Sequence, residues 1–216
     1  MTVGGMWRSN AVILVLLVVV SFMFAQLPEA LYIGLGALVL AGAIFICYRQ
    51  GGAMGHEACS ISKTIERIQD PQNPAHGQLD KNTMKQAYDV GRGFKGLVAS
   101  ALIPYVINCA YLIVMILAVR NIYVVFGTRL LAYVVSLPFW PLIAHWHEAF
   151  DVITPDIIAL LILSPFVLPA ATFIGYLQGP KLWEKTEKAM AQGKRRAKAK
   201  SRVAKKRQPR VQKPEI

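Results

Sequence analysis

Charged residues are scarce in this chain, and acidic residues are the scarcest of them. Among 216 residues, 24 are Lys or Arg and only 12 are Asp or Glu, so that charged residues make up 17% of the sequence. Soluble domains carry about 25% charged and about 45–50% apolar residues, whereas 55% of this chain is hydrophobic. The composition excludes a soluble enzyme and a disordered regulator, and it predicts a polytopic membrane protein.

Cysteine is also scarce. The three cysteines, Cys47, Cys59 and Cys109, cannot all pair, and their spacing is not that of metal ligands. Cys47 and Cys109 lie within apolar segments, where cysteine usually packs as a small hydrophobic residue. We therefore expect three free thiols, with Cys59 the most exposed to solvent. A disulfide-stapled secreted module is excluded.

Known sequence motifs of enzymes are missing, and the one match to a cofactor-binding motif lacks the neighbouring residues that such a site needs. There is no nucleophile elbow, no Walker sequence and no H-E-x-x-H. Residues 91–96 match G-x-G-x-x-G, but the preceding strand and the later acidic residue of a dinucleotide site are lacking. We interpret these glycines as a flexible lead into the next apolar segment, with phosphate capture at the helix start as a minor alternative. The sequence favours a non-enzymatic protein without a cofactor.

His145, His147 and Glu148, followed by Asp151, form the only cluster of metal-type ligands in the sequence. Histidines two residues apart face one side only in an extended segment, whereas a helical zinc site needs a spacing of four. Trp146 lies between them, as in an aromatic belt at a membrane interface. We prefer this interfacial interpretation and keep metal binding as the weaker alternative.

Long apolar segments define the expected membrane spans. A bilayer core about 30 Å thick needs about 20 mostly apolar helical residues. Four segments meet this requirement, namely residues 11–27, 31–48, 96–119 and 157–177. A fifth segment, residues 130–146, is apolar but contains Pro138 and Pro141, which suit a broken helix better than a continuous one.

The distribution of basic residues distinguishes four spans from five. Residues 49–95 carry seven Lys and Arg, and residues 181–216 carry 14 against three Glu. A fifth complete span would place these two basic regions on opposite faces, against the positive-inside rule. With four spans, 22 basic residues lie inside and two outside. We predict an all-α polytopic membrane protein with four transmembrane helices plus a re-entrant or interfacial element. Five transmembrane helices are the alternative.

This topology divides the chain into four regions: a transmembrane hairpin (1–48), a cytoplasmic amphipathic loop (49–95), a transmembrane region with the proline-broken segment (96–177) and a basic tail (178–216). Both termini are expected in the cytoplasm, and the membrane is expected to be the inner membrane of a bacterium. An apolar stripe over residues 58–68 predicts a short helix in the loop. The tail has too few apolar residues to form a core, so we expect it to be largely disordered.

Polar and small residues within the spans suggest packing rather than chemistry. Ala30, Gly34, Ala37 and Ala41 form a stripe that lets helices approach closely. Asn108 lies one turn after Pro104, and we interpret it as an amide that bonds a proline-freed carbonyl or a neighbouring helix. Arg129 is expected to face a wet cavity or an anion. Because no acidic residue lies within a full span, proton antiport is disfavoured.

The tail is the strongest functional signal in the sequence. Between residues 194 and 213 it has no acidic and no aromatic residue, which predicts an anionic partner bound by charge. The candidate binding residues are Lys194, Arg195, Arg196, Lys198, Lys200, Arg202, Lys205, Lys206, Arg207, Arg210 and Lys213. Such a tail is similar in layout to that of insertase-type proteins that hold ribosomes at the membrane. A solvated tail that only sets the topology is the simplest alternative.

The sequence supports two possible functions. The first is a non-enzymatic membrane protein whose tail engages ribosomal RNA or acidic lipid. The second is a small transporter or channel subunit, which the proline-broken segments suggest. Besides membrane lipids and the tail's partner, we expect a helix-packing partner or a second copy of the chain.

Overall fold

The computed structural model describes residues 3–24, 26–70, 72, 81–117, 121–142 and 154–207. All the secondary structure within these residues is helical. Its elements are α1 (Val3–Phe24), α2 (Glu29–Gln69), α3 (Lys81–Met84), α4 (Val90–Ile116), α5 (Ile122–Ser136), the 3-10 helix η1 (Leu137–Leu142), α6 (Pro155–Leu177) and α7 (Gly179–Arg207). Five helical segments are long and apolar enough to cross a membrane. The chain is therefore an all-α polytopic membrane protein, as predicted.

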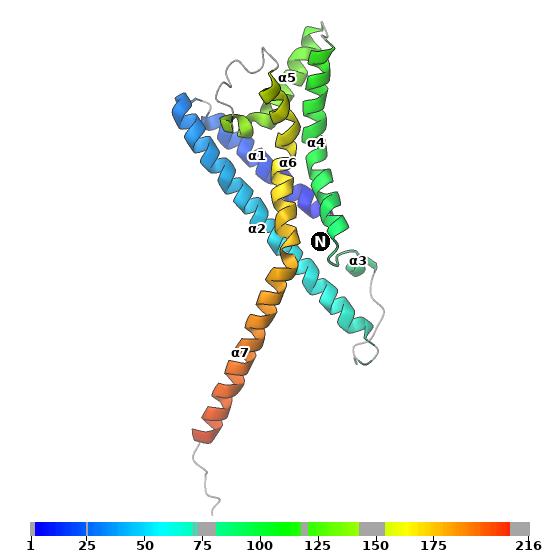
Figure 1. Cartoon of the computed structure of the whole chain (residues 1–216), viewed down its shortest axis with the longest axis vertical. Helices are drawn as coiled ribbons and strands as arrows, with labels where there is room; N and C mark the ends of the chain where they lie inside the picture. Colours follow the sequence, from blue (N-terminus) through cyan, green and yellow to red (C-terminus); the bar gives the residue numbers. More distant parts are fainter. Residues whose placement is uncertain are drawn as a thin grey trace, which may run out of the picture.

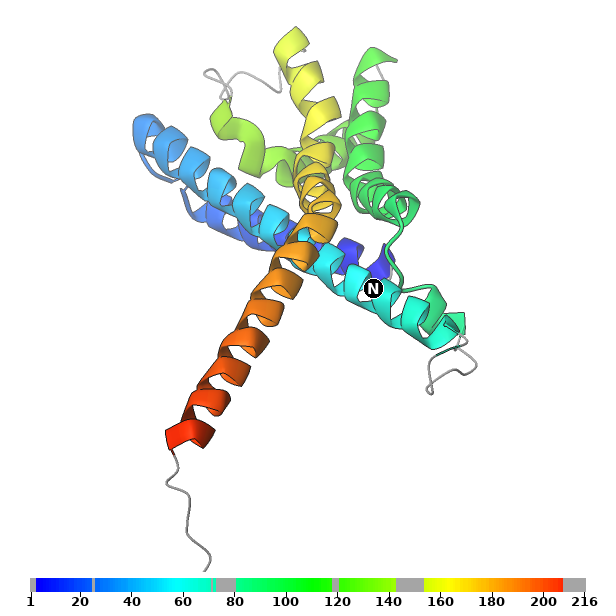
Figure 2. The same ribbon diagram turned by 60° about the horizontal axis from the view of Figure 1, so that its bottom comes forward.

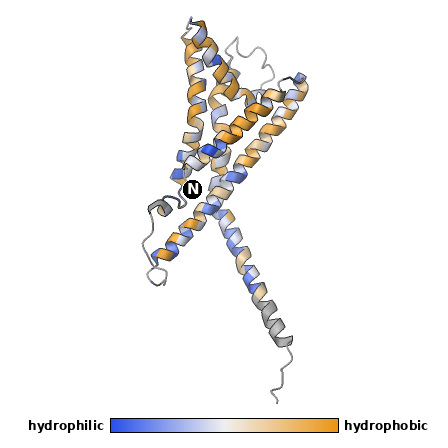
Figure 3. Ribbon diagram, turned by 180° about the vertical axis from the view of Figure 1, so that it is seen from behind, coloured by the Kyte–Doolittle hydropathy of each residue, from blue (hydrophilic) through white to orange (hydrophobic). Residues whose placement is uncertain are grey.

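The helices of the bundle consist mostly of apolar residues (Figure 3), and many of these residues are exposed. Large hydrophobic side chains such as Phe22, Leu38 and Ile116 are more than 60% exposed. In water, an apolar surface of this extent would drive association, whereas in a bilayer it faces acyl chains. The hydrophobic residues that bury each other instead lie along the inner faces of α1, α2, α4 and α6 and on α5 and η1.

α1 and α4 run through the bundle in one direction, and α2 and α6 run in the other (Figure 1). Met6, near the start of α1, packs against Gly96, near the start of α4. The Thr172 hydroxyl, near the end of α6, donates to Asn10 Oδ1 at 2.7 Å. The starts of α1 and α4 and the end of α6 therefore share one end of the bundle. We call it the basic end, because Arg8, Arg92 and Lys95 lie on these helix starts, Lys181 follows the end of α6, and Arg49 on α2 is next to Gln50, which bonds Ser9 of α1.

α2 crosses the junction of α6 and α7 with the helix backbones in direct contact (Figure 1). The contact is made by two pairs of glycines, Gly51 and Gly55 on α2 and Gly175 and Gly179 on the other side. A Cβ atom at any of the four would overlap with backbone atoms of the opposing helix. Glycine permits such close approach between helices in lipid.

The stripe of small residues that we expected to pack lies on another face of α2. Ala30, Gly34 and Ala41 are exposed, and a Cβ at Gly34 would meet no atom within 4 Å. The buried face carries Tyr32, Gly36 and Cys47 instead. Small residues recur at helical spacing on both faces of α2. Their spacing alone therefore does not show which face packs against other helices.

The proline-broken segment enters the bundle and stops partway. α5 begins beside the end of α4, and its last residue, Ser136, bonds Asn108 at 3.2 Å. Asn108 lies eight residues before the end of α4, and its amide also bonds Leu161, six residues into α6. At 1.5 Å per residue, these contacts are about 9–12 Å from the end of the bundle opposite the basic end.

From there, η1 turns towards α2 rather than continuing through the bundle. The Tyr32 hydroxyl donates to the Leu137 carbonyl at 3.3 Å, and the Pro141 ring packs on Gly36. The next described helix, α6, starts at the same end as α5 (Figure 2). Among the described helices, α1, α2, α4 and α6 cross completely. This arrangement agrees with the predicted re-entrant element and not with a fifth complete span.

The expected amphipathic loop is largely a continuation of the bundle helices. The helix predicted over residues 58–68 is the last part of α2, which runs unbroken for 41 residues. The glycines of residues 91–96 lie inside α4, which starts with the Asp89 side chain accepting from the Gly91 amide at 3.0 Å. Gly93 packs on the Tyr176 ring and Gly96 on Met6. The proposed flexible lead is therefore wrong, because these glycines make room for neighbouring side chains.

The cysteines are free, as predicted, but their exposures differ from the expectation. Cys59 is buried at 8% exposure, whereas Cys109 is partly exposed. Burial raises the pKa of the Cys59 thiol, and the nearby Lys63 acts in the opposite direction. The expected exposure of Cys59 is therefore wrong, because α2 continues through this residue and buries it.

The glycine crossing gives a stability prediction. Gly51→Ala and Gly55→Ala should lower the stability of the purified protein by about 1–3 kcal/mol each, the usual cost of overpacking. Gly34→Ala is the matched control on the same helix, and it should be neutral or stabilising because alanine favours helix formation by up to about 1 kcal/mol. Thermal unfolding in detergent measures both. Equal effects at Gly51 and Gly34 would contradict the crossing.

The re-entrant element gives a topology prediction. In a variant without native cysteines, Cys placed at Asn121 and Cys placed at Asp156 should react with an impermeant maleimide from the same side of sealed vesicles. Cys placed at Gly193 should react only from the other side, because α6 crosses between Asp156 and Gly193. Labelling of Asn121→Cys and Asp156→Cys from opposite sides would mean that residues 122–153 cross completely.

Candidate functional sites: the polybasic helix and the intramembrane polar cluster

α7 is a direct continuation of α6. A single residue, Gln178, separates the two helices, and the Leu182 amide donates to its carbonyl at 3.1 Å. Pro180 lies in the first turn, a position that suits its fixed φ angle. Leu182 packs near Gly52, and the rings of Trp183 and His56 lie 5.2 Å apart. These contacts with α2 fix the direction in which α7 leaves the bundle.

Beyond Trp183 the described side chains of α7 are exposed, and Glu187 lies near enough to Lys63 on α2 to interact with it electrostatically. Every side chain from residue 184 to residue 197 is exposed. Figures 1 and 2 show α7 running away from the bundle in both views, while the second half of α2 runs in another direction. The helix is thus presented to its surroundings on all sides.

The charge of α7 is concentrated in its distal part. Residues 181–190 carry three Lys and two Glu and are nearly balanced, whereas residues 194–207 carry nine Lys and Arg and no acidic residue. At 1.5 Å per residue, the distal part begins about 22 Å beyond Gly179 and ends about 42 Å beyond it. We call residues 194–207 the distal basic segment. It is separated from the bundle by a nearly neutral stalk.

The helix extends where we expected a largely disordered tail. Ala, Lys, Arg and Gln dominate this stretch, and all four have high helix propensity. The described helix ends at Arg207, just before Pro209, and a residue before proline disfavours helical geometry. Of the predicted binding residues, Lys194, Arg195 and Arg196 are exposed on α7. The others up to Arg207 belong to the same helix, while Arg210 and Lys213 lie outside the described residues.

Within the membrane region, Asn108 is completely buried and serves a neighbouring helix. Its Nδ2 donates to the Leu161 carbonyl at 2.8 Å. Pro165 lies four residues after Leu161 and lacks the N–H that would otherwise bond this carbonyl. Asn108 therefore replaces a hydrogen bond lost in α6, and not one lost at Pro104 in its own helix. This is the packing role that we preferred for it.

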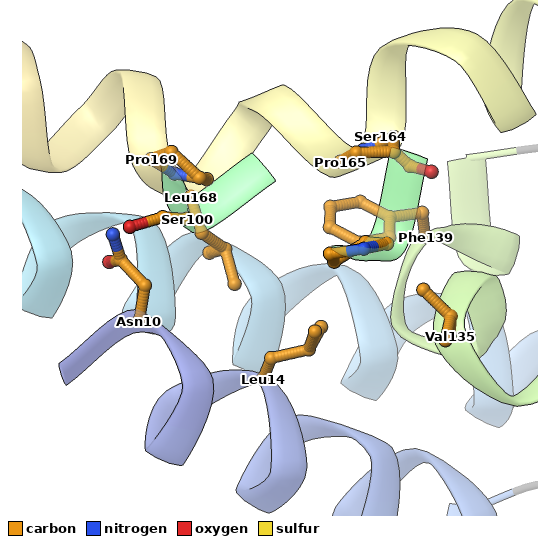
Figure 4. Close-up of a pocket in the computed structure, with 10 residues that line it drawn as sticks. Asn10, Leu14, Ser100, Val135, Phe139, Ser164, Pro165, Leu168 and Pro169 are labelled. Carbon is orange, nitrogen blue, oxygen red and sulfur yellow. The ribbon is translucent and has the colours of Figure 1, made fainter. Parts of the chain in front are cut away.

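Arg129 lies on α5, seven residues after Ile122, and is half-buried. A small cavity of about 20 Å³ lies between α1, α4, α5, η1 and α6 (Figure 4). Arg129 is not among the residues that line this cavity, which include Asn10, Ser100 and Ser164. That Arg129 faces a wet cavity or an anion therefore stays a prediction.

The amide of Asn108 gives a prediction that separates packing from ligand binding. Asn108→Leu should destabilise the protein by about 1–2 kcal/mol, because the Leu161 carbonyl loses its donor in a lipid environment. Pro165→Ala restores the intrahelical N–H, so it should recover part of this loss in the double variant. Thermal unfolding of the two single variants and the double variant measures the coupling. Strictly additive effects would show that Asn108 does not act through this carbonyl.

His145, His147 and Glu148, the weak metal candidates, lie outside the described residues. Among the residues that the structure does describe, no group of three His, Cys, Asp or Glu side chains is placed to hold a metal ion. Comparison of the chain with protein families, curated proteins and solved structures finds no match. The arguments for function therefore rest on the geometry and charge of the chain itself.

Proposed function

We propose that the chain is a non-enzymatic protein of the bacterial inner membrane that holds an RNA-rich particle, such as the ribosome, at the cytoplasmic face. The observation that carries this proposal is the distal basic segment of α7. Nine positive charges without an acidic residue stand on a helix that leads away from the bundle. This is a surface for phosphate groups that lie at a distance from the membrane.

The orientation in the proposal follows from the charge of the two ends. Arg8, the start of α4 and α7 all belong to the basic end, and Glu29 and Asp156 lie at the opposite end. Basic residues in short flanking segments remain in the cytoplasm. The basic end, with both chain termini, is therefore assigned to the cytoplasm.

The position of the charge favours RNA over the lipid of the same membrane. Electrostatic attraction between exposed charges fades beyond about 8 Å at physiological salt, and the distal basic segment starts about 22 Å along the helix. Segments that bind acidic lipid usually place their basic residues immediately next to the membrane. Interfacial helices also need a large apolar face, and Val203 is the one large apolar residue of the distal basic segment.

The proposal predicts a salt-dependent interaction with ribosomes that depends on the distal basic segment. Replacing its nine Lys and Arg by Gln keeps helix propensity and removes the charge. This variant should lose co-sedimentation with ribosomes, and wild-type affinity should fall with salt with a log–log slope of roughly −6 if all nine residues contact phosphates. The matched control replaces Lys181, Lys185 and Lys188 by Gln, and it should retain most binding.

Vesicles containing acidic lipid provide the second arm of this experiment. Binding of the distal basic segment, fused to a soluble carrier, to such vesicles but not to ribosomes would replace RNA by lipid as the partner. Binding to neither would leave the segment as a determinant of topology. A loss of ribosome binding in proportion to the charges removed, nine in the distal variant and three in the proximal one, would show that total charge, and not its distance from the membrane, matters.

A small transporter or channel subunit is the second candidate. It is supported by the re-entrant α5 and η1, because broken helices within membranes often surround sites for small solutes or ions. The cavity beside them is about 20 Å³ in volume, which is room for one water-sized molecule. Solute or ion flux in proteoliposomes that persists after neutralisation of the distal basic segment would favour this candidate.

A further inference from the structure

Prolines inside α4 and α6 leave backbone carbonyls without their usual donors. Pro104, Pro165 and Pro169 lie within these helices, and each lacks the N–H that would bond the carbonyl four residues earlier. The affected carbonyls belong to Ser100, Leu161 and Pro165. In a bilayer each such group needs another partner within the protein.

One of the three carbonyls has a visible substitute. Leu161 accepts from the Asn108 amide at 2.8 Å. The other two residues, Ser100 and Pro165, line the same small cavity (Figure 4). The two prolines responsible, Pro104 and Pro169, line it as well. The cavity therefore forms where a break in α4 faces a break in α6.

A buried hydroxyl lines this cavity too. Ser164 is 4% exposed, and its Oγ has no hydrogen-bond partner among the residues that the structure describes. A buried hydroxyl without a partner is costly, so it marks a position where a further polar group is needed. Asn10 lines the opposite side, with its Oδ1 already accepting from Thr172.

We propose that this cavity is a binding site for one ordered water molecule. Its volume of about 20 Å³ exceeds the 10–15 Å³ that a water requires. In this proposal the water accepts the hydrogen of Ser164 Oγ and donates to the carbonyls freed at Pro104 and Pro169, whose residues Ser100 and Pro165 line the cavity. Three bonds are the usual number for a buried water.

The lining favours a neutral ligand over an ion. Asn10, Ser100 and Ser164 are its polar side chains, and none of the lining residues is charged. A cation at this depth would be desolvated without a counter-charge, which is expensive in a membrane. The bound water joins α4 to α6 at the level where both are broken, so it is a structural ligand of the bundle.

Filling the cavity tests the proposal. Val135 lines it, and Val135→Ile adds one methylene group. If the water is present, this substitution displaces it and should lower the midpoint of thermal unfolding by roughly 2–4 °C. Val134→Ile, on the lipid-exposed side of the same helix, is the matched control and should have little effect. An unchanged or raised midpoint for Val135→Ile would mean a dry cavity and would overturn the proposal.

Variants without the prolines show whether Val135→Ile lowers the unfolding midpoint by displacing the water or by overpacking. Pro104→Ala and Pro169→Ala restore the N–H groups, so the two carbonyls no longer need the water. In that background Val135→Ile should cost much less, whereas overpacking would persist unchanged and would contradict the proposal. Either proline variant alone gives a partial version of the same test. A wild-type midpoint that rises with Na⁺ or K⁺, but not in Ser164→Ala, would replace the water by a cation.

Discussion

The backbone contact between α2 and the α6–α7 junction is the constraint on which the rest of the structure depends. Gly51 and Gly55 meet Gly175 and Gly179 without space for a single Cβ atom. Helices in lipid gain little from the hydrophobic effect and associate through such close packing. Because both helices continue through the crossing, it sets the directions of the second half of α2 and of α7. The position of α7 relative to the bundle therefore depends on these four glycines.

The second organising feature is the need to satisfy backbone groups within the membrane. Prolines interrupt α4, α6 and η1, and in lipid each freed carbonyl must find another donor. Asn108 supplies one for α6, and the Tyr32 hydroxyl donates to the Leu137 carbonyl at the start of η1. Polar side chains in the bundle thus hold broken helices together. This role accounts for the complete burial of Asn108 and Tyr32 within the bundle.

Properties that depend on composition and on counting charges could be predicted from the sequence. Apolar length identified the helices that are long enough to cross a membrane, and the distribution of Lys and Arg favoured a re-entrant segment, which agrees with α5 and α6 starting at the same end of the bundle. Both signals are local and additive along the chain, so they do not require knowledge of neighbours. The free cysteines followed from their number and spacing for the same reason.

Properties that depend on which helices meet could not be predicted. Ala30 and Gly34 have the spacing of a packing face, yet Gly36, Gly51 and Gly55 make the contacts, and only the partner helix decides between them. Asn108 was expected to compensate a proline, but its partner lies 53 residues away in another helix. We predicted disorder for residues 178–216 because they have too few apolar residues to form a core. The high helix propensity of Lys, Arg and Ala predicts the observed α7 instead.

In our proposal, the nearly neutral residues 179–193 of α7 hold the distal basic segment away from the membrane. A spin label at Gly193, an exposed position on α7, tests this in nanodiscs containing acidic lipid. Power saturation compares collisions with a water-soluble nickel chelate and with oxygen, and a label at Phe22 on the lipid-exposed face of α1 is the reference. The account predicts that the Gly193 label is fully accessible to the chelate, with no dependence on acidic lipid. An oxygen-dominated signal at Gly193 that strengthens with acidic lipid would contradict it, since the helix would then lie on the membrane.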